Sequence, residues 1–536
     1  MSTSWESVPD RSVSRLRWFG ALLVALLVAG VGTLGDYGLT WDEPYYFWAQ
    51  EKQQRWFAQL VRAPDQALSR EGLRLGWDPD PYHNPHPPFY KLLANLTRWL
   101  TPRSVDDFTA YRLTPATLYA VTGVLLGWLV ARAKGVRVGV FAAALWATIP
   151  PVFAHAHFAA TDTPMTFFGV ATVAAFWRSR ERRDGIVALG VLLGLAVATK
   201  FTAFLLPVPL VLWSARHRDR AGLLALTAAA PLALGIAILA VPYWWHDPVG
   251  GVVAFVRAST SRESHTPIAG LLWGKAYPFH APWTQPFTMI AVGTPLTLWV
   301  PGLVGILRAT VRRGRDPDSS MWVAAMSVPL VATLLPQAPN HDGLRLLMPL
   351  LPFVAALAAV ELAEWGSLLG RFWLRASLGD SPRGAVALVI TASAVVGVQA
   401  SATWVYHPYQ LSYYNELVAG LSGARSRGLE VTYWMEAFTP RVLRDVQALL
   451  PPSAEINLPV GDPFYFRYLQ ARGRLRPDLS FTSGAELPFQ LVLSRVAVLG
   501  GERMSALDRV PALYSASFDD VPLVRLFRIA GPGASP

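Results

Sequence analysis

Three carboxylates stand where apolar segments of this sequence begin or end. Asp42 and Glu43 follow the first long apolar run, and Asp162 directly precedes another. Acidic residues at membrane edges are costly and often functional, and a carboxylate partly withdrawn from water can act as a general base. The alternative is that Asp42 and Glu43 are solvated charges beside a membrane. We take all three as candidate catalytic residues.

Histidines accompany these carboxylates and raise the question of a metal ion. His86 lies in the proline-rich segment 82–91, and His341 is followed by Asp342. Imidazole and carboxylate groups are ligands for divalent ions, although no HExxH pattern is present. A divalent ion therefore stays open as a cofactor, with Glu43, His86 and His341 as candidate ligands. The alternative for segment 82–91 is a rigid interfacial turn with solvated imidazoles.

The elements that position these residues are membrane helices. The chain has 536 residues, of which 52% are hydrophobic and only 15% charged, whereas soluble domains carry about 25% charged residues. A helix needs about 20 mostly apolar residues to cross a bilayer. We predict about 11 such spans, near 18–39, 113–131, 138–154, 163–177, 185–199, 201–214, 221–243, 288–307, 321–336, 343–363 and 384–404. The fold class is therefore mainly α, a polytopic membrane protein.

The loops between these spans differ in charge from one side to the other. Arginine-rich loops alternate with loops that hold most of the histidines and acidic residues, at 40–112, 155–162, 244–287 and 337–342. Under the positive-inside rule the arginine-rich side is cytoplasmic. We therefore expect the active site on the extracytoplasmic side, in a membrane domain spanning 1–404. Amphipathic helices at 45–60 and 89–100 would lie in the interface within the first external loop.

After residue 404 the hydropathy drops and short alternating runs appear, at 491–499 and 523–529. Alternation of this kind predicts strands. We expect residues 405–536 to form a small extracytoplasmic α/β or α+β domain.

Several functions lose support from what the sequence lacks. It contains no cysteine, so thiolate metal sites and cysteine nucleophiles are absent. It has no Walker A motif and no GxSxG elbow. The glycines at 30, 32 and 35 match GxGxxG but lie at the end of a membrane span without a preceding strand, which favours helix packing over nucleotide binding. The net charge of +11 follows from the arginine-rich loops, so we expect no nucleic-acid partner.

The order of motifs resembles the GT-C glycosyltransferases, in particular the family 39 branch that includes protein O-mannosyltransferases and aminoarabinose lipid A transferases. The resemblance covers roughly residues 36–365. The segments that carry it are Trp41-Asp42-Glu43, His86-Pro87-Pro88-Phe89-Tyr90, Thr161-Asp162-Thr163-Pro164, Thr199-Lys200-Phe201-Thr202 and Asn340-His341-Asp342-Gly343-Leu344-Arg345. Where family members often have His-Arg, this chain has His341-Asp342 with Arg345 further on.

This resemblance implies a polyprenyl-phosphate-linked sugar donor, inversion at the anomeric carbon and an active site between the first external loop and the membrane. Asp42 matches the expected base, and Glu43 and Asp162 match acidic residues of the site. The candidates for binding the donor phosphate are Arg345, Lys200 and Lys91, and those for the acceptor and sugar pocket are His86, Tyr90, His155, His157 and His341. Isolated cations near membrane ends, Arg257, Arg262 and Lys275 among them, can instead extend to lipid head groups.

The expected partners are a polyprenyl-phosphate sugar, membrane lipids and an acceptor that is a protein, a lipid or a glycan. The expected location is a bacterial inner membrane. The rival function is a secondary transporter, whose carboxylates would bind protons or substrate near the midplane. A third alternative is a noncatalytic binding subunit, which would tolerate the loss of Asp42.

Overall fold

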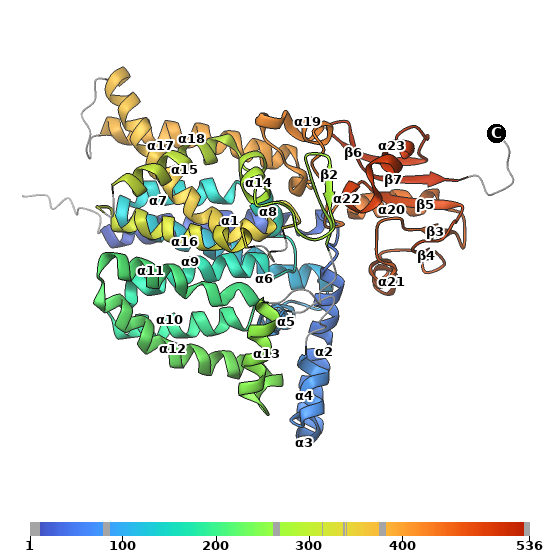
Figure 1. Ribbon diagram of the computed structural model, residues 1–536, viewed down its shortest axis with the longest axis horizontal. Coiled ribbons are helices and arrows are strands. Elements are labelled where there is room, and N and C mark those ends of the chain that lie inside the picture. Colours follow the sequence, from blue (N-terminus) through green and yellow to red (C-terminus); the bar gives the residue numbers. More distant parts are fainter. Residues whose placement is uncertain are drawn as a thin grey trace, which may run out of the picture.

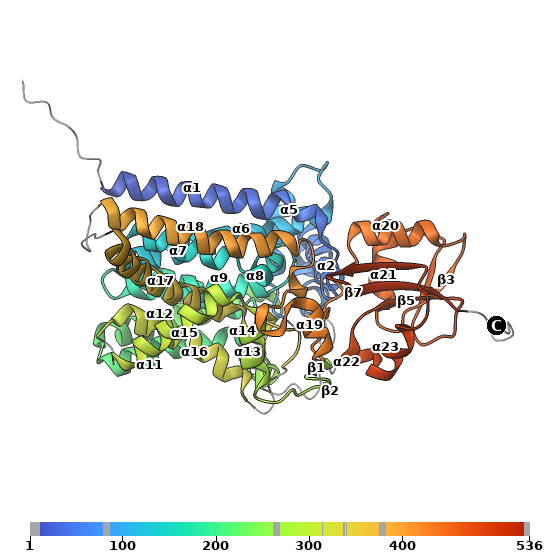
Figure 2. The ribbon, with the colours of Figure 1, turned by 90° about the horizontal axis from the view of Figure 1, so that it is seen from above.

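The protein is seen here in a computed structural model, which describes residues 11–78, 86–260, 268–312, 315–335, 338, 340–374 and 382–529. It has two parts (Figure 1). A bundle of roughly aligned helices makes up one part, and the C-terminal residues form a sheet with helices at one end of that bundle. Figure 2 shows the same division from above, with the first helix along one face of the bundle.

The predicted spans coincide with helices of the bundle. These are α1 (Arg11–Gly32), α6 (Asp107–Lys134), α7 (Val136–Ala147), α8 (Pro150–His155), α9 (Asp162–Ser179), α10 (Arg183–Val197), α11 (Pro207–His217), α12 (Arg220–Ala240), α14 (Gln285–Gly293), α15 (Leu296–Val311), α16 (Pro317–Thr333), α17 (Leu351–Leu374) and α18 (Pro382–Val405). Short 3₁₀ helices precede two of them, η2 (Phe201–Leu205) before α11 and η4 (Arg345–Leu350) before α17.

Prolines interrupt four of the predicted spans. Span 138–154 is divided between α7 and α8 at Pro150, and span 288–307 between α14 and α15 at Pro295. Spans 201–214 and 343–363 each begin as a 3₁₀ helix, with Pro207 and Pro349 at or near the change. Proline lacks the amide hydrogen and clashes with the preceding turn, so an apolar run that contains it need not be one helix.

Five helices among the described residues are long and apolar enough to cross a membrane, where we predicted about 11 spans. They are Leu16–Asp36, Asp107–Lys134, Arg220–Ala240, Arg345–Leu368 and Val386–Val405. The remaining predicted spans coincide with helices that are shorter or less apolar. The chain is therefore a mainly helical membrane protein.

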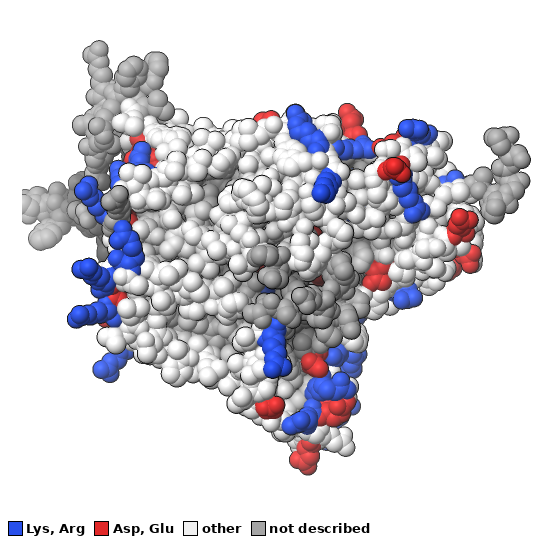
Figure 3. Space-filling view, viewed as in Figure 1, with Lys and Arg blue, Asp and Glu red and all other residues white. Residues whose placement is uncertain are grey.

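Charge is distributed unevenly along the bundle. Figure 3 shows Lys and Arg gathered at the end of the bundle far from the C-terminal part, and a belt with few charges beside them. The turns between α6 and α7, α9 and α10, and α11 and α12 belong to this far end, and they are the arginine-rich loops that we assigned to the cytoplasm. An uncharged belt between two charged ends is the surface that a bilayer requires.

At the other end of the bundle, α2 (Glu43–Arg62), α3 (Pro64–Ala67) and α4 (Arg70–Trp77) lie across the bundle axis (Figure 1). The same segment between the first two long helices also contains η1 (Leu34–Asp36) and α5 (Phe89–Leu100). Helices α2 and α5 coincide with the two amphipathic helices predicted at 45–60 and 89–100. Further on are η3 (Pro242–Trp244), α13 (Pro248–Thr260) and the hairpin of β1 (Gly270–Leu272) and β2 (Lys275–Tyr277).

The C-terminal part contains a five-stranded sheet in the order β4-β3-β5-β7-β6. The strands of this sheet are β3 (Glu455–Asn457), β4 (Ser480–Thr482), β5 (Phe489–Leu493), β6 (Tyr514–Phe518) and β7 (Val521–Arg528). The helical segments of the C-terminal part are η5 (Gln410–Ser412), η6 (Glu416–Val418), α19 (Gly420–Ser426), α20 (Pro440–Leu449), α21 (Pro463–Ala471), α22 (Val496–Leu499) and α23 (Gly501–Leu507). Strand β3 pairs in parallel with β4 and β5, so the loops that follow these three strands lie at one edge of the sheet. Residues 496–499, predicted as strand, are helical.

Candidate active site

A cavity of about 1350 Å³ lies where the helical bundle, its connecting segments and the C-terminal part meet. Three kinds of residue line it. The starts of α2, α9 and η4 supply charged side chains, α11 and α16 supply apolar ones, and the loops after β3 and β4 supply the wall formed by the C-terminal part. The volume exceeds the range of roughly 300–1,000 Å³ that is usual for one small ligand. It leaves room for two substrates together.

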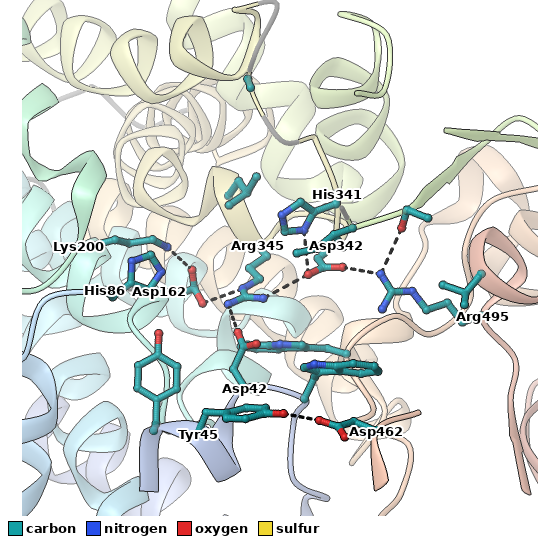
Figure 4. A pocket seen from close by; sticks show the side chains of 18 of the residues that line it. Asp42, Tyr45, His86, Asp162, Lys200, His341, Asp342, Arg345, Asp462 and Arg495 are labelled. Carbon is teal, nitrogen blue, oxygen red and sulfur yellow. Dashed lines mark hydrogen bonds and ion pairs between the residues drawn. The ribbon is translucent and has the colours of Figure 1, made fainter. Parts of the chain in front are cut away.

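One guanidinium gathers three carboxylates in this cavity (Figure 4). Arg345 donates from Nη2 to Asp42 Oδ2 at 2.5 Å, from Nε to Asp162 Oδ2 at 3.0 Å and from Nη1 to Asp342 Oδ2 at 3.2 Å. Its face lies over the ring of Trp434, with 3.9 Å between the guanidinium carbon and the ring centroid. Four segments far apart in sequence are thereby held together by one planar, permanently charged group.

The three carboxylates differ in their access to the cavity. The side chains of Asp162 and Asp342 are 1% and 4% exposed, whereas that of Asp42 is 21% exposed. Lys200 Nζ donates to Asp162 Oδ1 at 2.7 Å, so both oxygens of Asp162 are paired. Asp42 has one oxygen bound to Arg345, and no described residue donates a hydrogen bond to the other. Asp42 is therefore the carboxylate of this cluster that is best able to accept a proton from a ligand.

Asp342 lies in a left-handed turn, with φ of 56° at Asp342 and 59° at Gly343. Burial alone would raise the pKa of the Asp342 carboxyl, but His341, Arg495 and Arg345 around it lower the pKa below its ordinary value. The two oxygens of Asp342 accept hydrogen bonds from two guanidinium groups, Oδ2 from Arg345 and Oδ1 from Arg495.

Glu43, although adjacent to Asp42, does not line the cavity. Its side chain is 0% exposed and accepts hydrogen bonds from Arg112 Nε at 2.8 Å and Nη2 at 2.7 Å. The backbone amides of Ala159 and Thr40 also donate to it, both at 2.8 Å. The contacts with Arg112 and Ala159 join α2 to α6 and to the loop before α9, so the environment of Glu43 is that of a structural ion pair rather than of a catalytic group.

Four other predicted residues do not line the cavity. His157 stacks on Tyr37, with 4.2 Å between ring centroids, and its Nε2 lies 2.8 Å from Thr33 Oγ1. Lys91 Nζ donates to the carbonyl oxygen of His86 at 2.6 Å. Tyr90 and His155 are also buried outside the cavity, the first against Tyr46 and the second against Trp434. By contrast, the cavity brings together six predicted residues, namely Asp42, His86, Asp162, Lys200, His341 and Arg345.

The candidate metal ligands do not converge. Glu43 is enclosed by Arg112, and in Figure 4 His86 lies beside Lys200 while His341 lies beside Asp342. Among the described residues, no group of three or more His, Asp or Glu side chains is arranged to hold a metal ion. Of the segments considered in the sequence, 82–85 and Arg262 lie outside the described residues.

None of the cavity residues from the C-terminal part was predicted as a site residue, and two of them are charged side chains that contact the rest of the site. Arg495 follows β5 and approaches Asp342, and Asp462 follows β3 and accepts a hydrogen bond from Tyr45. The signal that indicates both is their position after parallel strands, because ligand sites in open α/β sheets lie at the carboxyl ends of strands. Our predicted strand at 491–499 placed Arg495 in the middle of a strand, which concealed this signal.

The comparisons with known proteins agree with this architecture. The crystal structure of ArnT from Cupriavidus metallidurans in the apo state superposes with a TM-score of 0.51 at 15% sequence identity, covering 96% of this chain and 98% of that one. The structure of the same protein bound to undecaprenyl phosphate gives a TM-score of 0.50 at 14% identity, covering 95% and 98%. Among curated protein sequences, none matches the chain.

The chain therefore has the fold of the GT-C glycosyltransferases, which confirms the resemblance drawn from its motifs. Within it, residues 85–246 match the family described as dolichyl-phosphate-mannose-protein mannosyltransferase. That segment runs from His86 in the cavity wall through Asp162 and Lys200 to the end of η3.

Proposed function

We propose that this protein is a membrane glycosyltransferase that moves a sugar from a polyprenyl-phosphate-linked donor to an acceptor hydroxyl, with Asp42 as the general base. The observation that carries the proposal is the environment of the Asp42 side chain. One of its oxygens is fixed by Arg345, its side chain is the most exposed of the three clustered carboxylates, and it lines a cavity large enough for donor and acceptor. A positioned carboxylate of this kind can accept a proton as a bond forms.

The reaction that fits this geometry is a single displacement. The acceptor oxygen attacks the anomeric carbon while its proton passes to Asp42. The bond between the anomeric carbon and the phosphate oxygen breaks, and the phosphate leaves with its electron pair on the lipid. One displacement inverts the anomeric configuration, as the resemblance implied.

The apolar wall supports a lipid-linked donor. Phe204 and Leu206 beside α11 and Val328 and Ala332 on α16 line the same cavity as the charged cluster. A polyprenyl chain would lie against these side chains while its phosphate reached the polar end. The binding of undecaprenyl phosphate by ArnT, which shares the fold, points the same way.

The placement of the carboxylates favours a transferase over a transporter. Asp42 precedes α2, Asp162 begins α9 and Asp342 precedes η4, so all three lie at helix ends beside the C-terminal part. Transporter sites lie near the bilayer midplane. We therefore also propose that the cavity and the C-terminal part face the extracytoplasmic side, opposite the arginine-rich turns.

The proposal is tested with purified protein in detergent and radiolabelled sugar on a polyprenyl phosphate carrier. Membranes from a strain that lacks the gene serve as a mixed source of acceptors. We expect label to move from the donor to a membrane component, and no transfer from nucleotide sugars when the lipid carrier is absent. Transfer from a nucleotide sugar alone, or solute movement across sealed vesicles without any sugar transfer, would contradict the proposal.

A further inference from the structure

Arg495 reaches the cavity from the C-terminal part with hydrogen-bonding capacity to spare. Its side chain is 9% exposed, and Nη2 donates to the carbonyl oxygen of Ala269 at 3.2 Å and approaches Asp342 Oδ1 at 3.4 Å. Its Nε is buried and has no hydrogen-bond partner among the described residues. A buried guanidinium N–H without a partner is costly, so a ligand at this position would be stabilised by it.

His341 occupies the other side of the same carboxylate. Its side chain is 4% exposed, and Nδ1 lies 2.9 Å from Asp342 Oδ2. Its Nε2 is buried without a hydrogen-bond partner in the part of the chain that the structure describes. Both His341 and Arg495 line the cavity, on either side of Asp342 (Figure 4), and each has a buried nitrogen atom without a partner among the described residues.

Arg345 and Lys200, which we predicted to bind the donor phosphate, are instead bonded to carboxylates of the protein. Arg345 directs Nε, Nη1 and Nη2 to three separate carboxylates, and Lys200 pairs with Asp162. Three of the five N–H groups of Arg345 are thereby engaged, and an anion at any of these three positions would have to displace a carboxylate. Arg345 thus has the contacts of a residue that positions Asp42.

The apolar wall leads toward His341. Val328 and Ala332 on α16 line the cavity, and further along the chain Thr333, Leu335, Ala338 and His341 line it as well. A lipid chain that follows α16 would therefore bring its head group to the side of the cavity where His341 and Arg495 stand. Lipid-facing and phosphate-binding surfaces would be continuous.

We propose that Arg495, together with His341, binds the phosphate of the lipid carrier. The inference rests on the proposed function and adds that the C-terminal part completes the donor site. A guanidinium can offer a phosphate two parallel charge-assisted hydrogen bonds, which a neighbouring imidazole supplements. Arg345 then acts as a positioning residue for Asp42, and the phosphate is held from the opposite side of Asp342.

The test measures binding of undecaprenyl phosphate to the purified full-length protein, by the shift in thermal unfolding temperature as the lipid is titrated. Arg495→Met should weaken binding at least about tenfold, because charge-assisted hydrogen bonds are lost while side-chain volume is kept. Arg495→Lys should recover part of the loss. In transfer assays the same variants should raise the KM for the donor more than they lower kcat.

Arg525 provides a matched control. It is a buried arginine on β7 of the C-terminal sheet, its Nη1 donates to Asp508 at 2.8 Å, and it does not line the cavity. Arg525→Met should reduce thermal stability but leave the affinity for undecaprenyl phosphate within about threefold of the parent. The double variant Arg495→Met/Asp342→Asn separates a structural role from a binding role. If Arg495 only neutralises Asp342, removing both charges restores binding, and the inference is overturned.

Two further results of these experiments distinguish a failure of the Arg495 assignment from a failure of the proposed function. If the parent binds undecaprenyl phosphate and transfers sugar while Arg495→Met binds the lipid equally well, the assignment of Arg495 fails and the transferase proposal stands. If the parent itself neither binds the lipid nor uses a lipid-linked sugar, both proposals fail. Loss of binding in Arg495→Met with partial rescue by lysine supports the inference.

Discussion

Arg112 donates hydrogen bonds to both carboxylate oxygens of Glu43, at 2.8 and 2.7 Å, in a site from which water is excluded on both partners. The neighbouring Asp42 instead lines the cavity and is 21% exposed. Two adjacent carboxylates therefore have different environments, and their substitutions should have different consequences.

Glu43→Gln should destabilise the protein. Removing one charge of a buried pair leaves the other uncompensated, at a cost of about 3–5 kcal/mol. Arg112 would lose both charged acceptors while it still bonded to the carbonyl oxygens of Tyr37 and Gly38. The expected result is a lower unfolding temperature and a lower yield in detergent, measured by scanning fluorimetry and size-exclusion chromatography.

The double variant Glu43→Gln/Arg112→Gln is the control for that prediction. Neutralising both partners should recover part of the stability, because no unpaired buried charge remains. A Glu43→Gln protein that is as stable as the parent but inactive would contradict the structural assignment and return Glu43 to the catalytic set.

Glu430 should make stability depend on pH. It is buried, and burial raises its pKa to about 7, although Arg495 and the amides of Val496 and Ala497 oppose the shift. Because the folded protein holds this proton more tightly than the unfolded chain, the stability contribution is present below about pH 4.5 and is lost as pH rises toward 7.

Glu430→Gln should flatten that dependence. Its amide oxygen can still accept from the backbone, but it does not ionise. We expect the unfolding temperature of the variant to exceed that of the parent at pH 8 and to match it near pH 5. Identical pH profiles for parent and variant between pH 4.5 and 8 would show that Glu430 does not titrate in this window.

The membrane orientation gives a prediction of its own. Alkaline phosphatase fused after Pro536 should be active, and a fluorescent protein that folds only in the cytoplasm should be dark at the same position, because the arginine-rich turns lie at the opposite end of the bundle from the C-terminal part. Fusions in the turn between α11 and α12 should give the reverse pattern. Fluorescence from the C-terminal fusion would place the cavity in the cytoplasm.

Local sequence patterns were sufficient for much of the helical framework and for six of the residues that line the cavity. Apolar periodicity placed α2, α5 and α6, and charges at the ends of apolar runs identified Asp42, Asp162 and Lys200. Hydropathy could not show where prolines divide a run, as between α14 and α15. Nor could it separate Asp42 from Glu43, since only the fold brings Arg112 to one and Arg345 to the other.

The contribution of the C-terminal part was beyond such patterns. Trp434, Asp462 and Arg495 are distant in sequence from the membrane helices. Asp462 and Arg495 follow β3 and β5, so their approach to the cavity depends on the parallel pairing of these two strands. Strand pairing of this kind is set by tertiary packing rather than by the local run of residues.

The central claim, that Asp42 removes the acceptor's proton, is tested most directly by the rate of sugar transfer in Asp42→Asn. The amide keeps the shape of the side chain but is a poor proton acceptor, so the rate should fall by about two to four orders of magnitude. The unfolding temperature and the affinity for undecaprenyl phosphate should stay close to those of the parent. Transfer within about threefold of the parent rate would contradict the account.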